Sequence, residues 1–213
     1  MVRTRLALAA AVLPLALHAR QPPAESAVRA EFRIFDGMEE ITASTRLRVM
    51  PAGRRDPVNT VEGDRPSVAL PPGIYDVQAL KLKHGSIAAI RWAERLVIMH
   101  YPDEAGRHLE VINFQPGFGA LQIRAGRGAI DAYEVAVFPR GDRGAAARTP
   151  LEGEGYRLFV LRAGRYDIRV RHAAGDTDAR DAHWYLDVEV PADRTRLKQV
   201  EASDGPTPPF VAR

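Results

Sequence analysis

The sequence predicts an all-β protein built as two tandem antiparallel β-sandwich repeats of Greek-key, prealbumin-like type. Three observations lead to this prediction. Apolar residues alternate with polar residues in several stretches, which is the period of a half-buried strand. Proline and glycine turns separate these stretches. The second half of the 213 residues repeats the first half at a spacing of about 90 residues, which is the size of a small domain.

The N-terminal segment is predicted to be a secretory signal peptide spanning residues 1–19. Two arginines precede an apolar run at residues 6–17, and Ala19 supplies a small residue for cleavage. The run is shorter than the roughly 20 residues that span a bilayer, and it contains a proline. An uncleaved membrane anchor is the alternative. We therefore expect a periplasmic or extracellular protein with no transmembrane segment after cleavage.

The charge balance argues against a nucleic-acid partner. The full chain carries 30 Lys and Arg against 27 Asp and Glu, for a net charge of +3. Removal of the two signal-peptide arginines leaves an excess of a single positive charge, and the remaining cations are spread along the sequence. The absence of cysteine excludes disulfides, zinc–thiolate sites and cysteine nucleophiles. An apolar core alone must hold the exported chain together.

Turn residues divide the rest of the chain. Residues 20–27 contain two prolines and are predicted to be a linker. The first repeat is expected at residues 28–114 and the second at 118–202, with a short seam rich in proline and glycine between them. Residues 203–213 contain three prolines without a strand pattern, which predicts a flexible tail.

Alternation defines the strands of the first repeat most clearly. Strands are expected where apolar side chains recur at every second position, namely Phe32 and Ile34, Leu47 and Val49, and Tyr75, Val77 and Ala79. After Ala79 the apolar phase shifts by one residue to Leu80 and Leu82, which is typical of a β-bulge. Residues 38–44 and 87–94 are the two stretches that could instead be helical.

Matched blocks recur in the second half in the same order. Residues 67–77 match 158–168, and residues 46–51 match 134–139. Near the end of each half, Val97 and Met99 are aligned with Leu186 and Val188, which predicts that these side chains share one core-facing phase. In this phase both tryptophans, Trp92 and Trp184, are expected in the core, and Tyr185 is expected to face solvent.

A glycine–tyrosine–aspartate motif follows a turn in both repeats. Its glycines can adopt positive φ without strain, and we expect its tyrosines to pack inward with the hydroxyl bonded to backbone and its aspartates to face outward or cap the turn. An acid–base role for the Tyr-Asp pairs is the functional alternative. The residues of this predicted structural motif are Gly73, Tyr75, Asp76, Gly164, Tyr166 and Asp167.

On these residues the chain resembles prealbumin-like sandwich modules, which include the carboxypeptidase regulatory-like domains and the PEGA-type domains of bacterial surface proteins. The resemblance covers both repeats and rests on the stretches LPPGIYDV and VLRAGRYDI. It implies a sandwich of seven or eight strands, used as an accessory or adhesion module and commonly without catalysis. The alanine-rich stretch at residues 83–101 departs from such modules.

Two polar clusters are the candidates for metal chemistry. Asp176, Asp178 and Asp181 could supply oxygens to calcium, and His183 could bind a transition metal, although the spacing lacks the glycine and glutamate of an EF-hand loop. His100 and His108 flank a second polar connection, which we interpret as an ordinary exposed loop. We therefore expect no bound metal and no cofactor.

These observations favour an exported, non-catalytic accessory module that binds a protein or a polysaccharide in the bacterial envelope. No serine lies in a nucleophile-elbow motif, and no glycine-rich stretch has the context of a phosphate-binding loop. Two alternatives stay open. One is a structural spacer or assembly component without a ligand, and the other is a hydrolase with its site at the domain junction.

Overall fold

The structure is a computed structural model that describes residues 27–100, 107–126, 128–142, 144, 146, 150–153, 155–173 and 182–200. Within these residues the regular elements are β-strands and two short 3₁₀ turns, so the prediction of an all-β protein is confirmed. Residues 87–94, one of the two stretches that could have been helical, belong to a strand. No described helix has the length and apolar composition needed to cross a membrane.

The first half of the chain forms two facing sheets. Sheet A contains β1, with β2 and β5 on one side of it and β8 on the other, and sheet B has the order β4-β3-β6-β7. The elements are β1 (Val28–Asp36), β2 (Glu39–Glu40), η1 (Thr42–Ser44), β3 (Thr45–Pro51), β4 (Asn59–Val61), β5 (Ser67–Leu70), β6 (Gly73–Lys83), β7 (Ser86–Ile98) and β8 (Arg107–Asn113).

The second half repeats this arrangement. Sheet C has the order β11-β12-β9-β15 and sheet D has the order β10-β13-β14, so each main strand has its counterpart in the first half. The elements are β9 (Phe118–Ala125), η2 (Ile130–Ala132), β10 (Tyr133–Pro139), β11 (Leu151–Gly153), β12 (Tyr156–Arg162), β13 (Gly164–His172), β14 (His183–Val190) and β15 (Thr195–Val200).

One pairing in each repeat differs from the expected antiparallel pattern. β8 lies parallel to β1, and β15 lies parallel to β9. The chain reaches β8 from β7, which belongs to the opposite sheet, so β8 does not follow β1 through a hairpin. A strand that arrives by a crossover can run in the same direction as its neighbour.

Alternation along the strands fills the two sandwich cores. On β1, Ala30, Phe32 and Ile34 point between sheets A and B and are fully buried. They pack against side chains of sheet B such as Leu47 and Val77. The core of the second repeat contains Leu121, Ile123, Val137, Phe159, Ile168 and Val170.

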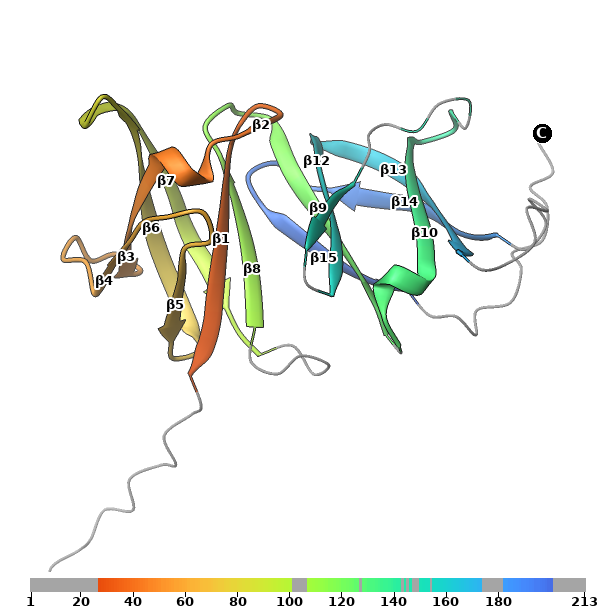
Figure 1. The fold of residues 1–213 in the computed structure, drawn as a ribbon, viewed down its shortest axis with the longest axis horizontal. Helices are drawn as coiled ribbons and strands as arrows, with labels where there is room; N and C mark the ends of the chain where they lie inside the picture. The colour runs from red at the N-terminus through yellow and green to blue at the C-terminus, as the bar shows by residue number, and fades with distance from the viewer. Residues whose placement is uncertain are drawn as a thin grey trace, which may run out of the picture.

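A third apolar cluster joins the two repeats. Figure 1 shows the four sheets as successive layers, with sheets A and C next to each other in the middle. The sides on which sheets A and C face each other are apolar. Sheet A is therefore covered by sheet B on one face and by sheet C on the other, and sheet C is covered in the same way by sheets A and D. The cluster consists of Phe35, Leu109 and Val111 from sheet A and Phe118, Ala120, Tyr156, Leu158 and Val160 from sheet C, with Leu151 packed against it.

Polar contacts surround this cluster. The Tyr156 hydroxyl donates to Glu31 Oε1 across 3.3 Å, and the backbone N–H of Val111 donates to Thr195 Oγ1 across 2.8 Å. Burial and the nearby Glu31 carboxylate raise the pKa of Tyr156 above its usual value, so the hydroxyl keeps its proton. Apolar packing and these hydrogen bonds hold the repeats as one unit.

The connection between β8 and β9 is tied to the first repeat. Asn113 Oδ1 accepts hydrogen bonds from the N–H groups of Gly37 and Gln115, and Asn113 Nδ2 donates to the Gly37 carbonyl. At the start of β9, a Cβ on Gly119 would lie 2.0 Å from the Pro191 carbonyl oxygen. The close approach of the backbone at Pro191 therefore requires glycine at position 119.

The junction predicts cooperative unfolding of the two repeats. Substitution Leu158→Asp places an unpaired carboxylate in the apolar cluster, which should lower the free energy of unfolding by about 3–5 kcal/mol. We expect the wild-type protein to unfold in one calorimetric transition and the variant in two. Ala69→Asp, at an exposed position of β5, is the control and should keep one transition. A single transition at the wild-type midpoint in Leu158→Asp would contradict this view of the junction.

Candidate functional site

The tyrosines of the repeated motif occupy equivalent positions. The Tyr75 hydroxyl donates to the Pro71 carbonyl and the Tyr166 hydroxyl to the Arg162 carbonyl, both across 2.8 Å. Both rings pack against the core of their own repeat. Burial raises the pKa of both hydroxyls, so they are proton donors in structural hydrogen bonds rather than bases.

The aspartates of the motif each bridge two segments of backbone. Asp76 accepts hydrogen bonds of 2.9 Å from the N–H of Arg95 at one oxygen and from the N–H of Gly53 at the other. Asp167 accepts from Asp187 across 3.0 Å and from Gly141 across 3.3 Å. Each carboxylate therefore ties the turn after β3 or β10 to an irregularity in β7 or β14.

The electrostatics of Asp76 favour its charged form. Burial opposes ionisation, but the hydrogen bonds from the Arg95 and Gly53 N–H groups outweigh burial, with help from the charges of Arg55 and Arg95. The pKa of Asp76 consequently lies below its usual value. A carboxylate held in this way acts as a fixed acceptor and is a poor proton carrier.

Positive φ angles occur at other residues of the same unit. Gly73 and Gly164 begin strands and are not in the left-handed region, so the positive φ that a glycine permits is not used at these two positions. Gly53 and Gly141, which donate to the aspartates, both have φ of 78°. Position 73 is still crowded, because a Cβ there would lie 3.3 Å from the Tyr75 ring.

Left-handed residues in β7 and β14 change which side chains face the core. Arg95 has φ of 57° and Asp187 has φ of 58°, and at each of them the register with the neighbouring strand shifts by one residue. Such a bulge reverses the inward and outward sides of the strand beyond it. Neither residue is a glycine, so no turn signal marks the position in the sequence.

The predicted phase is therefore wrong for Val97, Met99 and Leu186, whereas it is confirmed for Val188 and Val190. Leu96 and Ile98 are buried, whereas Val97 and Met99 are 48% and 43% exposed. In the second repeat, Tyr185 packs against the core with Val188, whereas Leu186 is 41% exposed.

The tryptophans also lie outside the cores. Trp92 is opposite Gln78 on the outer face of sheet B, and its ring is 4.5 Å from the Arg55 guanidinium carbon. Trp184 is opposite Arg169 on the outer face of sheet D, and its ring centroid lies 5.4 Å from that of Phe138. Each indole covers the outer face of its own sheet.

The predicted metal candidates do not come together in the described part of the chain. Asp176, Asp178 and Asp181 lie outside the described residues, and the ring of His183 lies against Tyr185 at 4.5 Å. Among the residues that the structure describes, no three His, Cys, Asp or Glu side chains are close enough to hold a metal ion.

The interpretation of His108 as a loop residue is wrong. His108 belongs to β8, is 1% exposed, and lies 2.8 Å from Glu110 Oε1 through Nε2. Its Nδ1 lies 3.3 Å from the Met99 carbonyl oxygen. His100, by contrast, is exposed, so the two imidazoles do not form a shared site.

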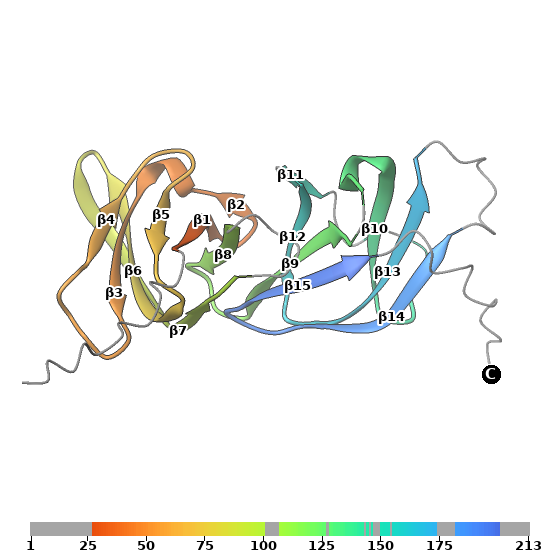
Figure 2. The same ribbon diagram turned by 90° about the horizontal axis from the view of Figure 1, so that it is seen from below.

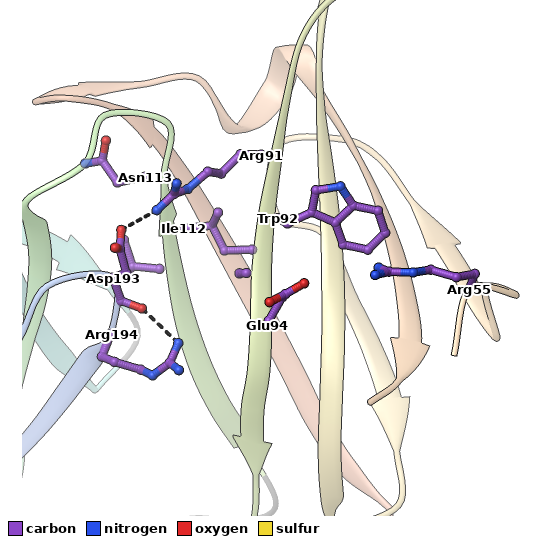
Figure 3. Close-up of a pocket in the computed structure, with 10 residues that line it drawn as sticks. Arg55, Arg91, Trp92, Glu94, Ile112, Asn113, Asp193 and Arg194 are labelled. Carbon is purple, nitrogen blue, oxygen red and sulfur yellow. Dashed lines mark hydrogen bonds and ion pairs between the residues drawn. The ribbon is translucent and has the colours of Figure 1, made fainter. Parts of the chain in front are cut away.

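A cleft of about 510 Å³ opens where the repeats meet. It lies between β7 and β8 of the first repeat and the turn that leads from β14 to β15, which reaches toward them in Figure 2. Figure 3 shows Arg91 pointing to Asp193, with which it forms an ion pair between the repeats. Other residues around the cleft are Arg55, Trp92, Glu94, Ile112, Asn113 and Arg194.

The chemistry of this cleft suits binding better than catalysis. Its carboxylates are Glu94 and Asp193, and Asp193 is already paired with Arg91. The described residues that line it include no histidine, serine or lysine, so neither His100 nor His108 is brought into it. The main contribution of the Arg91–Asp193 pair is a polar contact between the repeats.

The outer faces of sheets B and D differ in the side chains that they expose. On sheet B, Ile74, Ile87, Ile90 and Val97 are 43%, 53%, 54% and 48% exposed. These residues lie on β6 and β7, on the same side as Leu80 and Leu82. We call the four exposed residues, together with the partly buried Leu82, the apolar face of sheet B; Leu80 lies on the same side but is only 1% exposed. Exposed apolar side chains gathered on one face are typical of an interaction surface.

Two equivalent positions of sheet D carry arginines instead. Counted from the glycine that starts each strand, Ile74 and Leu80 of β6 correspond to Arg165 and Arg171 of β13. Arg165 pairs with Asp187, and Arg171 pairs with Glu134 of the neighbouring strand. The outer face of sheet D thus has ion-paired arginines at the two positions where the outer side of sheet B has Ile74 and Leu80.

Comparisons with known proteins do not assign a family. No protein-family profile and no curated protein matches the chain. Among solved structures it is similar to the TIE protein of Bacillus anthracis, with 14% identity, 83% of this chain and 34% of that protein covered, and a TM-score of 0.28. The chain thus spans about a third of the length of that protein.

Two further similar structures come from fimbriae and pili. The tip fimbrial protein Mfa3 of Porphyromonas gingivalis has 8% identity, with 81% of this chain and 94% of that protein covered, and a TM-score of 0.29. GBS52, the minor pilin of Streptococcus agalactiae, has 10% identity, with coverages of 87% and 100% and a TM-score of 0.26. Because these TM-scores are low, the fold of this chain is assigned from its own sheets, as described above, and not from the similar structures.

The bridging carboxylate of Asp76 predicts a pH-dependent effect of Asp76→Asn. The amide places a donor against one of the two backbone N–H groups, which should cost about 1–3 kcal/mol at pH 7. Because the folded pKa of Asp76 is lowered, its stabilisation is complete above the unfolded value of about 3.9 and is lost as the pH falls through the folded pKa. The difference between wild type and variant in denaturant unfolding should therefore shrink toward acid pH.

The exposed Asp56 provides the control for this measurement. Asp56→Asn removes the same charge from a loop of the same repeat and should leave the unfolding free energy nearly unchanged. Equal stability of wild type and Asp76→Asn at pH 7 would show that the two hydrogen bonds contribute nothing.

Proposed function

We propose that this chain is an exported, non-catalytic accessory module that binds a protein of the bacterial envelope through the apolar face of sheet B. The observation that carries this proposal is the contrast between sheets B and D. Where repeat 2 has Arg165 and Arg171 in ion pairs, repeat 1 exposes Ile74, and Ile90 lies beside Leu80. Burial of such a face in a complex would stabilise it by about 25 cal/mol per Å² of apolar surface.

The chemistry of this face favours a protein over a polysaccharide. Its side chains are branched hydrocarbons without hydrogen-bonding groups, whereas sugars require many hydrogen bonds. Aromatic rings can stack on sugars, but the Trp92 ring on this sheet is already covered by Arg55. A polysaccharide partner is therefore the second choice for this surface.

The export part of the proposal rests on the sequence. Residues 1–19 have the composition of a cleaved signal peptide, and the absence of cysteine suits a periplasmic or extracellular protein that relies on its core. The resemblance to prealbumin-like and PEGA-type modules, carried by Tyr75, Asp76, Tyr166 and Asp167, supports an accessory role. We also propose that the first repeat ends near residue 114 and that the second repeat begins near residue 118.

The apolar cluster between sheets A and C supports a second candidate function. A module whose repeats are held at a fixed angle by Phe35, Leu158 and their neighbours is suited to act as a spacer or an assembly component. The two functions differ in one respect that can be measured. A spacer has no need of the apolar face of sheet B, whereas a binding module depends on it.

Photo-cross-linking from envelope extracts tests the proposal. In the processed chain, the exposed Val58, which lies in the first repeat between β3 and β4, is replaced by a residue with a benzophenone side chain. Proteins captured by irradiation are quantified by mass spectrometry. We expect Ile87→Ser combined with Ile90→Ser to reduce capture of a specific protein by about tenfold or more, because the apolar contact is lost.

Leu186→Ser serves as the matched control for these variants. Leu186 is a similarly exposed apolar residue on the outer face of sheet D, so its loss should leave capture unchanged. Capture that is equally strong in the double variant and in wild type would reject the apolar face of sheet B as the binding surface and would favour the spacer.

A further inference from the structure

The apolar face of sheet B lies in a part of the chain that lacks acidic residues. From Val77 to Ala93 there is no Asp or Glu, although the stretch contains Lys81, Lys83 and Arg91. It covers most of the β6–β7 hairpin, whose tip extends past the first residue of β3. In Figure 1 the tip of this hairpin lies at the upper left, away from the second repeat, whereas Arg91 of β7 reaches the turn between β14 and β15.

Two cations beside this face have no acidic partner among the described residues. Arg48 lies opposite Gln78 on the outer side of sheet B, and the exposed Lys83 follows the outward Leu82 at the hairpin tip, so it adjoins this face without being part of it. Neither forms an ion pair within the described part of the chain, whereas Arg46 pairs with Glu62 and Lys81 with Asp36. The arginines on the outer face of sheet D, Arg165 and Arg171, are paired as well.

We infer that the partner of this surface is a protein whose contact region combines apolar side chains with carboxylates placed to meet Arg48 and Lys83. This inference rests on the function proposed above and specifies the chemistry of the partner. Complementary charge at the rim of an apolar contact sets orientation and speeds association. The apolar residues supply the affinity and the two cations select the partner.

A second copy of the chain does not meet this requirement. In a two-fold symmetric contact each surface faces itself, so the apolar face of one copy would meet the same face of the other. Arg48 and Lys83 would then lie against the hairpin face of the other copy, which offers them no carboxylate between Val77 and Ala93. Cations held at an interface without an acidic partner weaken it, so the surface disfavours self-association.

A lipid surface is also a poor match. Recognition of anionic membranes typically involves clusters of about four to eight basic residues, each contributing about 1 kcal/mol. Here two unpaired cations would contribute about 2 kcal/mol, which is too little for stable attachment. The exposed apolar residues are moreover spread along the sheet from Ile74 to Ile87 rather than collected at the tip.

Binding of two synthetic copolymers to the processed full-length chain tests the inference. The probes are the random copolymers poly(Glu,Tyr) and poly(Lys,Tyr), which share an apolar component and differ in the sign of their charge. We expect wild type to bind the acidic copolymer about tenfold or more tightly than the basic one, and expect added salt to weaken this binding. Arg48→Glu combined with Lys83→Glu should remove the preference.

A matched charge change elsewhere separates this site from the overall charge of the protein. Arg65→Glu combined with Arg196→Glu alters the net charge equally, at exposed positions outside the hairpin. This control should retain the preference for the acidic copolymer, and so should Leu186→Ser. Ile87→Ser combined with Ile90→Ser should weaken binding of the acidic copolymer because the apolar contact is lost.

Several outcomes would overturn the inference. Equal binding of both copolymers by wild type, or an equal loss of binding in the two charge-reversal variants, would show that Arg48 and Lys83 do not select acidic partners. Co-sedimentation with phosphatidylglycerol vesicles that is lost in Ile87→Ser/Ile90→Ser would replace the protein partner with a membrane. If the copolymers fail but envelope capture still requires Ile87 and Ile90, the charge inference falls while the proposed function stands.

Discussion

The orientation of side chains in both repeats depends on a carboxylate that accepts two backbone hydrogen bonds. Asp76 and Asp167 each connect a glycine turn to a left-handed residue in the next strand, Arg95 or Asp187. The left-handed residue inserts a bulge, and the bulge decides which side chains of β7 and β14 reach the core. The outward position of Trp92 and Trp184, and the exposure of Val97, follow from this geometry.

This dependence explains how far the sequence could be read. The all-β class and the core residues of β1 and β3 could be predicted, because period-two alternation is a local property and a buried face enforces it. The phase of β7 could not, because its shift occurs at Arg95, a residue type with no preference for positive φ, and is stabilised by Asp76 from another strand. Likewise, the bulge predicted after Ala79 is absent from β6, which pairs with β3 without a register shift, so that Leu80 and Leu82 lie on the outer side. The register shift near them has its extra residue in β7.

The contact between the repeats was even less accessible to sequence reasoning. Phe35 and Leu109 occupy the strand positions that would face solvent in an isolated sandwich. The residues that cover them belong to the other repeat, so the sequence near Phe35 and Leu109 does not reveal the contact. The same is true of the candidate interaction surface. The exposure of Ile74 stands out when sheet D is placed beside sheet B, because the equivalent Arg165 is charged and paired with Asp187.

The two parallel pairings give the molecule a particular response to mechanical force. β1 and β8 run in the same direction, so the start of β1 and the end of β8 lie at opposite ends of their shared ladder. The same holds for the start of β9 and the end of β15. A pull applied along the chain therefore slides each pair lengthwise and loads all of its hydrogen bonds together, instead of peeling them apart one after another. Both sandwiches are thus closed by the strand geometry that best resists extension.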